Sequence, residues 1–83
     1  MKHAARTLTI DGEQWVGIPE AAHLVGRQPL TIRRWRHSRW IREHRSGYHV
    51  YVPVNDVMET EATIESGDTP SPRWSENPPP GVE

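Results

Sequence analysis

Residues 20–37 read EAAHLVGRQPLTIRRWRH, and the fold that the sequence predicts is built outward from this stretch. Ile18, Ala22 and Val25 recur at the spacing of one apolar helix face, which predicts a first helix that Pro19 opens and that ends near Val25. Ala22 is small enough to let a second helix cross the first one closely. This stretch therefore begins as a short helix with a packing face.

Gly26 supplies the turn after this helix, because glycine tolerates the positive φ that a tight turn between helices requires. Pro29 fits the first position of a second helix, where its missing N–H is not needed. The pattern predicts a second helix from Pro29 to His37 or Ser38. Two short helices joined by a glycine turn are thus expected.

The second predicted helix has two unlike faces. Ile32 and Trp35 share one face, which we expect to be buried. The opposite face carries, at positions i, i+3, i+4 and i+7, Leu30, Arg33, Arg34 and His37. This arrangement resembles a helix-turn-helix, whose second helix enters the major groove of DNA. The alternative is an ordinary helical hairpin with a solvated charged face.

A β-hairpin is predicted before the helices. Residues 6–10 (RTLTI) and 13–17 (EQWVG) flank Asp11-Gly12, a dipeptide that favours hairpin turns because both positions adopt positive φ. We expect Leu8, Ile10 and one of Trp15 or Val16 to face the core. A loosely ordered arm is the alternative.

A second hairpin is predicted after the helices, with Ile41-Arg42 leading in, a turn over residues 43–47 and a return strand over residues 48–52. Pro53 would end it, because proline lacks a donor for the strand ladder. Arg45 would lie at its tip. A basic hairpin after a candidate recognition helix predicts a wing that reaches the backbone or the minor groove. The alternative is a sheet that only covers the core.

A third helix is expected from an N-cap at Asn55 to about Ile64, with Gly67 stopping it. The segment from Ser66 onward is polar and proline-rich, and such a composition predicts disorder. The predicted fold class is therefore α+β: a small winged helix-turn-helix domain over residues 1–65, with two to three short helices, an N-terminal hairpin and a wing. Residues 66–83 would form a disordered acidic tail.

Charge is strongly divided along the chain, although the net charge of the 83 residues is −1. Residues 27–49 hold seven arginines and one acid, whereas residues 59–83 hold six acids and one arginine. Such asymmetry predicts a basic binding surface and an acidic tail. Arginine suits bidentate contacts to phosphate and guanine better than lysine does.

The composition argues against other classes of function. A chain of 83 residues without cysteine has room for one small domain and no thiolate metal site. The five histidines lack the spacing of a metal site, and no catalytic constellation is visible. We expect a non-enzyme without metal, cofactor, small-molecule substrate or membrane association, located in the cytoplasm and nucleoid-associated when bound to DNA.

The motif PEAAHLVGRQPLTIRRWRH, a short basic hairpin and then YVPVNDV resemble the family of phage excisionases and MerR-type winged helix-turn-helix domains. The resemblance covers about residues 16–58. It implies binding of duplex DNA at repeated sites, DNA bending, and an integrase or further copies of the same chain as partners. The sequence departs from the family at Ser38-Arg39, where many relatives have glycine, and at Gln28, where many have serine or threonine.

The expected DNA-binding residues lie on the second helix and in the wing. The resemblance implies that Thr31 and Arg33 touch DNA. Arg33 or Arg34 can pair with guanine through two hydrogen bonds, and Gln28 can either read adenine or cap the helix. The full set is Arg27, Gln28, Thr31, Arg33, Arg34, Arg36, His37, Arg42, Arg45, Ser46, Gly47 and Tyr48.

The leading hypothesis is a sequence-specific DNA-binding protein, either an excisionase of a phage or mobile element or a small transcriptional regulator. A small terminase subunit for DNA packaging is one alternative, although it needs an oligomerisation element. A second alternative is a protein–protein adaptor that acts through the acidic tail and Trp74.

Overall fold

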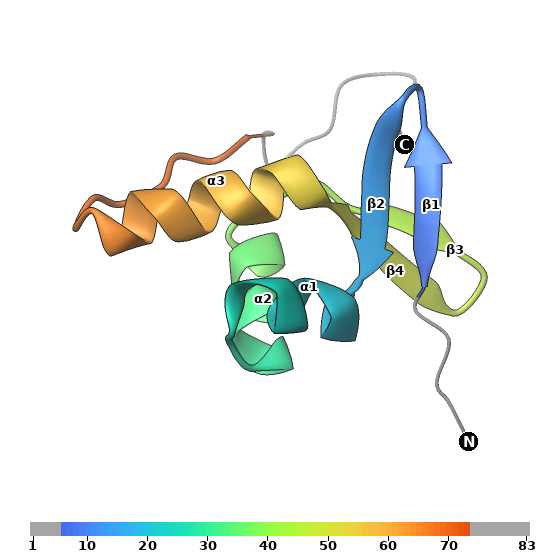
Figure 1. The fold of residues 1–83 in the computed structure, drawn as a ribbon, viewed down its shortest axis with the longest axis horizontal. Helices are drawn as coiled ribbons and strands as arrows, with labels where there is room; N and C mark the ends of the chain where they lie inside the picture. The colour runs from blue at the N-terminus through green and yellow to red at the C-terminus, as the bar shows by residue number, and fades with distance from the viewer. Residues whose placement is uncertain (1–5, 74–83) are drawn as a thin grey trace.

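The computed structural model describes residues 6–73, which form three helices and one four-stranded antiparallel sheet (Figure 1). The α+β class is therefore confirmed. The elements in chain order are β1 (Thr7–Ile10), β2 (Glu13–Gly17), α1 (Ile18–Val25), α2 (Pro29–His37), β3 (His44–Ser46), β4 (His49–Pro53) and α3 (Val54–Glu65).

Both predicted hairpins are present, and they join into one sheet with the strand order β1-β2-β4-β3. The junction is an antiparallel pairing of β2 with β4, in which Val16 lies opposite Val52 and Trp15 lies opposite Pro53. The two helices between the hairpins return the chain to the sheet, and α3 follows β4 directly. The sheet thus connects the N-terminal hairpin to the candidate wing.

The two hairpin turns differ in how well the sequence predicted them. Asp11 and Gly12 both have positive φ, 53° and 78°, as expected for that turn. The predicted turn over residues 43–47 is wrong: β3 occupies residues 44–46, and the turn is Gly47-Tyr48. Gly47 has a φ of 62° and takes the first of two turn positions, where glycine fits a tight hairpin. Arg45 consequently lies within β3 rather than at the tip.

The ends of α1 and α2 lie at or next to the residues that the sequence predicted. α1 begins at Ile18, one residue before the predicted start, and α2 has the predicted bounds. Gly26 ends α1 with a φ of 68°. Its N–H donates to the carbonyl of His23 at 3.2 Å, and the next N–H, of Arg27, donates to Ala22 at 2.9 Å. These two bonds form a Schellman motif, which satisfies carbonyls at the helix end.

The same motif ends α2, but with an arginine in the left-handed position. Arg39 has a φ of 63°, and its N–H donates to the carbonyl of Arg36 at 3.0 Å. The N–H of Trp40 donates to the carbonyl of Trp35 at 2.9 Å. The left-handed conformation costs a residue with a Cβ about 1–2 kcal/mol. This position is where the family resemblance led us to expect glycine.

α3 differs from the prediction at its start and agrees at its end. The helix begins at Val54 with Pro53 as N-cap and no side-chain capping bond, so the predicted cap at Asn55 is wrong. Asn55 is instead the second helical residue. Gly67, with a φ of 87°, follows the end of the helix as expected.

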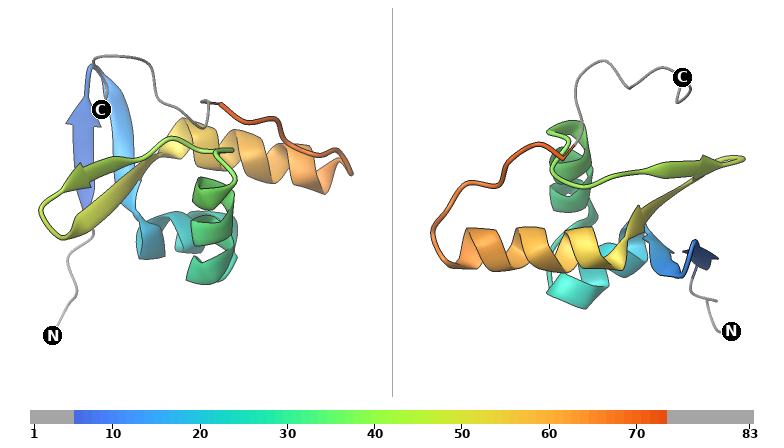
Figure 2. Two further views of the ribbon diagram at one scale, coloured as in Figure 1. Left: turned by 180° about the vertical axis from the view of Figure 1, so that it is seen from behind. Right: turned by 90° about the horizontal axis from the view of Figure 1, so that it is seen from above.

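Residues 66–73 contain no helix or strand but are held against the domain. They turn back from the far end of α3 toward the end of α2 (Figure 2). The backbone N–H of Arg73 donates to the carbonyl of Arg39 at 2.6 Å, and its Nε donates to the carbonyl of Trp40 at 2.6 Å. Arg73, within the predicted tail, is thus bound to the loop after α2, and the rest of that tail from Trp74 onward lies outside the described residues.

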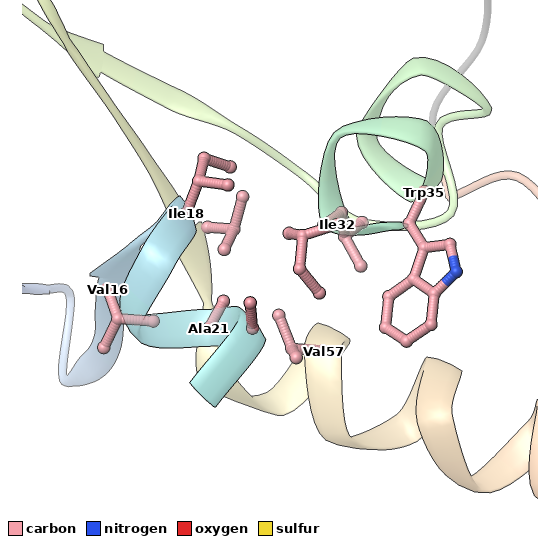
Figure 3. Close-up of a cluster of buried hydrophobic side chains, with 9 residues drawn as sticks. Val16, Ile18, Ala21, Ile32, Trp35 and Val57 are labelled. Atoms are coloured by element: carbon pink, nitrogen blue, oxygen red, sulfur yellow. The ribbon is translucent and has the colours of Figure 1, made fainter. Parts of the chain in front are cut away.

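The core lies where the three helices meet one face of the sheet (Figure 3). Ile32 and Trp35 are buried there, which confirms the predicted inner face of α2. Leu8 and Ile10 are only half-buried and are not part of this cluster, contrary to expectation. The buried side chains that form the cluster are Val16, Ile18, Ala21, Ala22, Ile32, Trp35, Ile41, Val52 and Val57.

Trp15 and Val16 are both buried, although the sequence predicted burial of only one. Neighbouring strand residues point to opposite faces of a sheet. Val16 joins the core cluster, whereas the Trp15 ring meets His44 edge-on with 6.2 Å between the ring centres. The guanidinium of Arg42 lies over the same indole at 5.4 Å. Val16 therefore packs in the core on one face of the sheet, and Trp15 packs against His44 and Arg42 on the other.

Asp56 is the buried polar centre of the fold, with only 3% of its surface exposed. Its Oδ2 accepts hydrogen bonds from the backbone N–H and the Nε of Arg42, both at 3.0 Å, and its Oδ1 accepts one from Nη2 at 3.2 Å. Arg73 Nε lies 3.7 Å from the same carboxylate. These bonds raise the pKa of the Arg42 guanidinium above its ordinary value. One carboxylate thus ties together α3, the approach to β3 and the returning segment.

Replacing Asp56 with alanine is expected to lower the free energy of unfolding by roughly 3 kcal/mol, between the value of one charged hydrogen bond and that of a broken buried pair. Glu13→Ala is the matched control, because Glu13 binds the same arginine at 2.6 Å but its side chain is 24% exposed, against 4% for Asp56. Its loss should stay below about 1 kcal/mol. Urea unfolding of both variants measures the difference, and equal losses would contradict a central role for Asp56.

Arg39→Gly is expected to be more stable than Arg39→Ala by roughly 0.5–1 kcal/mol, because both variants remove the same side chain and only glycine relieves the left-handed strain at a φ of 63°. Ser38→Gly is the control at the neighbouring position, where φ is −80° and glycine offers no relief. That variant should be destabilised by roughly 0.4–1 kcal/mol. Thermal unfolding measures all three variants, and an Arg39→Gly variant that melts no higher than Arg39→Ala would refute the strain argument.

Candidate nucleic-acid interface

The outward arc of α2, which consists of Arg33, Arg34 and His37, is an exposed basic surface. The side chains of Arg33, Arg34 and His37 are exposed on the helix face opposite Ile32 and Trp35. Within residues 6–73, neither Arg33 nor Arg34 forms an ion pair with a carboxylate. Their guanidinium groups are therefore available to an external anion.

Arg27, which we expected on DNA, is turned toward α3 instead. Its Nε donates to Glu61 Oε1 at 2.6 Å and its Nη2 to Oε2 at 3.3 Å. Glu65 adds a longer ion pair at 3.6 Å, and the guanidinium lies 5.8 Å from the centre of the Trp35 ring. The hydrogen bond from Arg27 lowers the pKa of Glu61. Arg27 thus joins the turn before α2 to α3.

Arg42 is likewise used within the domain. Its guanidinium is shared between Asp56 and Glu13 and covers the Trp15 ring. The backbone N–H of Arg42 is also bound by Asp56, so this residue is fixed at both ends. Arg42 therefore joins the sheet to α3, and its contact to DNA stays a prediction.

Arg36 and Arg45 share a single carboxylate. Arg36 Nη1 lies 2.8 Å from Glu43 Oε1, and Arg45 Nε lies 3.4 Å from Oε2. Glu43 is the one acid among residues 27–49, and it lies between the helix and the hairpin. The side chain of Arg45 remains 67% exposed on β3. These two arginines therefore connect α2 to β3 and still border the solvent.

The start of α2 presents two further predicted residues. Gln28 is the N-cap residue of α2, as one of the two interpretations expected, but its exposed side chain forms no capping hydrogen bond. Thr31 is half-buried, and its N–H donates to the carbonyl of Gln28 at 2.9 Å. The amide of Gln28 is thus free to meet a ligand at the beginning of the outward arc.

The hairpin of β3 and β4 projects from the sheet beside the helices (Figures 1 and 2). Ser46, Gly47 and Tyr48 are all exposed at its end. Tyr48 is fully exposed, at 101% of its reference surface. Its aromatic ring is thus accessible to a ligand.

A groove of about 240 Å³ lies between this hairpin and the two helices. Its lining includes three arginines together with the hairpin residues Tyr48 and His49; the arginines are Arg6, Arg33 and Arg36. Arg6 was not among the predicted contacts, because its position before a core strand gave no signal that it would face the second hairpin. The groove continues the basic surface of α2 toward the hairpin.

Two further observations concern metal ions and membranes. Over residues 6–73, histidine and acidic side chains form no cluster of three that could hold a metal ion. No helix in that range is both long and apolar enough to cross a membrane.

Comparison of the chain with models of protein families, with curated proteins and with solved structures found no match. The exposed arc of α2, the hairpin and the groove between them are thus the features from which a function is inferred.

The contact between Arg27 and Glu61 predicts a particular acid sensitivity. Because the folded-state pKa of Glu61 lies below its ordinary value of 4.5, this contact stabilises the fold fully above pH 4.5. The stabilisation is lost as the pH falls through the lower folded-state pKa. Glu61→Gln should therefore flatten the fall of the melting temperature below pH 4.5.

Glu59→Gln is the matched control, because Glu59 lies on the same helix but pairs with Arg73 at 2.8 Å, and its side chain is 64% exposed. Its melting temperature should follow the wild-type pH profile closely. Identical profiles for the Glu61→Gln variant and the wild type would show that the pair contributes nothing to acid stability.

Proposed function

We propose that the protein binds duplex DNA in a sequence-dependent manner. In this proposal α1, the turn at Gly26 and α2 act as a helix-turn-helix, and α2 enters the major groove. The hairpin of β3 and β4 acts as a wing on the backbone or the minor groove. The role proposed for the protein is that of an excisionase or a small transcriptional regulator, which is what the family resemblance suggests.

The outward arc of α2 is the observation that carries this proposal. Arg33 and Arg34 are exposed and lack carboxylate partners in the described domain, whereas Arg27, Arg36 and Arg42 have them. The core face of α2 is fixed by Ile32 and Trp35. A rigid helix with unpaired guanidinium groups on its outer face suits bidentate recognition of guanine and charge-assisted contact to phosphate.

The groove beside the arc supports the same proposal. Arg6 and Arg33 line it and extend the positive surface from α2 toward the hairpin, where Tyr48 and His49 can contact the sugar–phosphate backbone. Contacts to the backbone position a protein on DNA, and contacts to base edges give it specificity. In this proposal the outward arc of α2 contacts the base edges, and the groove contacts the backbone.

Arg33→Ala and Arg34→Ala are each expected to weaken binding to a selected DNA site by roughly 1–3 kcal/mol, the value of a good base contact. Arg27→Ala is the matched control, because it removes the same charge from a side chain held by Glu61. That variant should bind DNA with nearly wild-type affinity at a temperature where it is folded. Titration by fluorescence anisotropy at fixed salt measures all three.

If Arg33→Ala and Arg34→Ala bind the selected site as tightly as the wild type, α2 is not the helix that contacts the bases. A loss in Arg27→Ala as large as in Arg33→Ala would indicate that charge alone governs binding. Footprinting on a natural target separates the two proposed roles: several tandem sites favour an excisionase, and one palindrome favours a dimeric regulator.

A further inference from the structure

The apolar side chain of Leu30 lies in the middle of the outward arc of α2. At 3.6 residues per turn, Leu30 lies about 170° around the helix axis from the midpoint of Ile32 and Trp35, which point into the core. Arg34 and His37 lie on either side of it on the outer face. Leu30 is 53% exposed and is not part of the core cluster. It therefore faces away from the domain as directly as a residue of this helix can.

We infer that Leu30 is a specificity residue that contacts the 5-methyl group of a thymine in the major groove. This inference rests on the proposed DNA-binding function and adds to it the identity of one base. Leu30 is the second residue of α2, and the first residues of a recognition helix contact base edges. A leucine has no hydrogen-bond donor or acceptor, and the thymine methyl is the apolar group that unmodified base edges offer in the major groove.

The neighbouring arginine restricts where this thymine lies. Arg34 follows Leu30 by four residues, so it is one helical turn away on nearly the same line, at a rise of about 6 Å. Base pairs are spaced by about 3.4 Å along duplex DNA. A helix that lies along the groove with Leu30 on a thymine thus places Arg34 within about two base pairs of it. The expected target combines a thymine with a nearby guanine.

The exposure of Leu30 also makes the inference testable without loss of the fold. Leu30→Ala creates no buried cavity, because the side chain is half exposed and outside the core cluster. Leu24 is the matched control: it is 49% exposed on α1 and lines a separate apolar depression with Pro19, His23 and Val54. Both leucines lose the same atoms on replacement, but only Leu30 lies on the arc.

The experiment begins with selection of a preferred duplex by the wild-type protein from a random library. Each thymine of that duplex is then replaced in turn by deoxyuridine, which removes only the methyl group. One position should weaken wild-type binding by roughly threefold to fivefold, the effect of burying one methyl group. Leu30→Ala should bind the thymine duplex more weakly and show no further loss with uracil at that position. Leu24→Ala should keep the wild-type sensitivity.

The outcomes separate this inference from the function on which it rests. If the wild type binds a selected duplex but no uracil weakens binding, Leu30 does not read a methyl group and the inference is overturned. The same conclusion follows if Leu30→Ala retains the full thymine preference. If selection enriches no sequence and the protein binds no duplex DNA, the proposed function itself fails.

Discussion

The fold depends on the buried carboxylate of Asp56, which lies within ion-pair distance of two arginines. Asp56 receives the backbone and side chain of Arg42 and lies beside Arg73, so a single anion at the start of α3 fixes segments from three parts of the chain. A buried charge is tolerated only when its hydrogen-bonding capacity is satisfied. Because this requirement is strict, it also restricts how the β3 and β4 hairpin leaves the helices.

The arginines of residues 27–49 differ in whether a carboxylate of the domain binds them. Arg27 and Arg42 are engaged with acids of α3 and β2, and these contacts hold the domain together. Arg33 and Arg34 have no such partner within residues 6–73 and lie on the surface that we propose for DNA. A net charge of −1 is therefore compatible with a strongly basic local surface, because several acids are placed where they neutralise the arginines that build the fold.

Local chemistry predicted much of this architecture, and contacts between distant residues account for what it missed. The turn at Gly26, the bounds of α2 and the turn at Asp11-Gly12 follow from short-range preferences, which the sequence displays directly. The second turn was misplaced because Gly47 follows polar residues without strand alternation, so the register had no local marker. The pairing of Arg27 with Glu61 joins residues 34 positions apart, and no periodicity reveals such a contact.

The returning segment changes where the domain can be regarded as complete. Helix α3 ends at Glu65, yet the chain continues back to the loop after α2, where Arg73 binds the carbonyls of Arg39 and Trp40. A shortened protein or a fusion joined at residue 65 would leave both carbonyls without these donors. It would also attach its partner at the far end of α3, whereas a junction after Arg73 starts beside the end of α2. The choice of junction thus decides which side of the molecule a fused partner occupies.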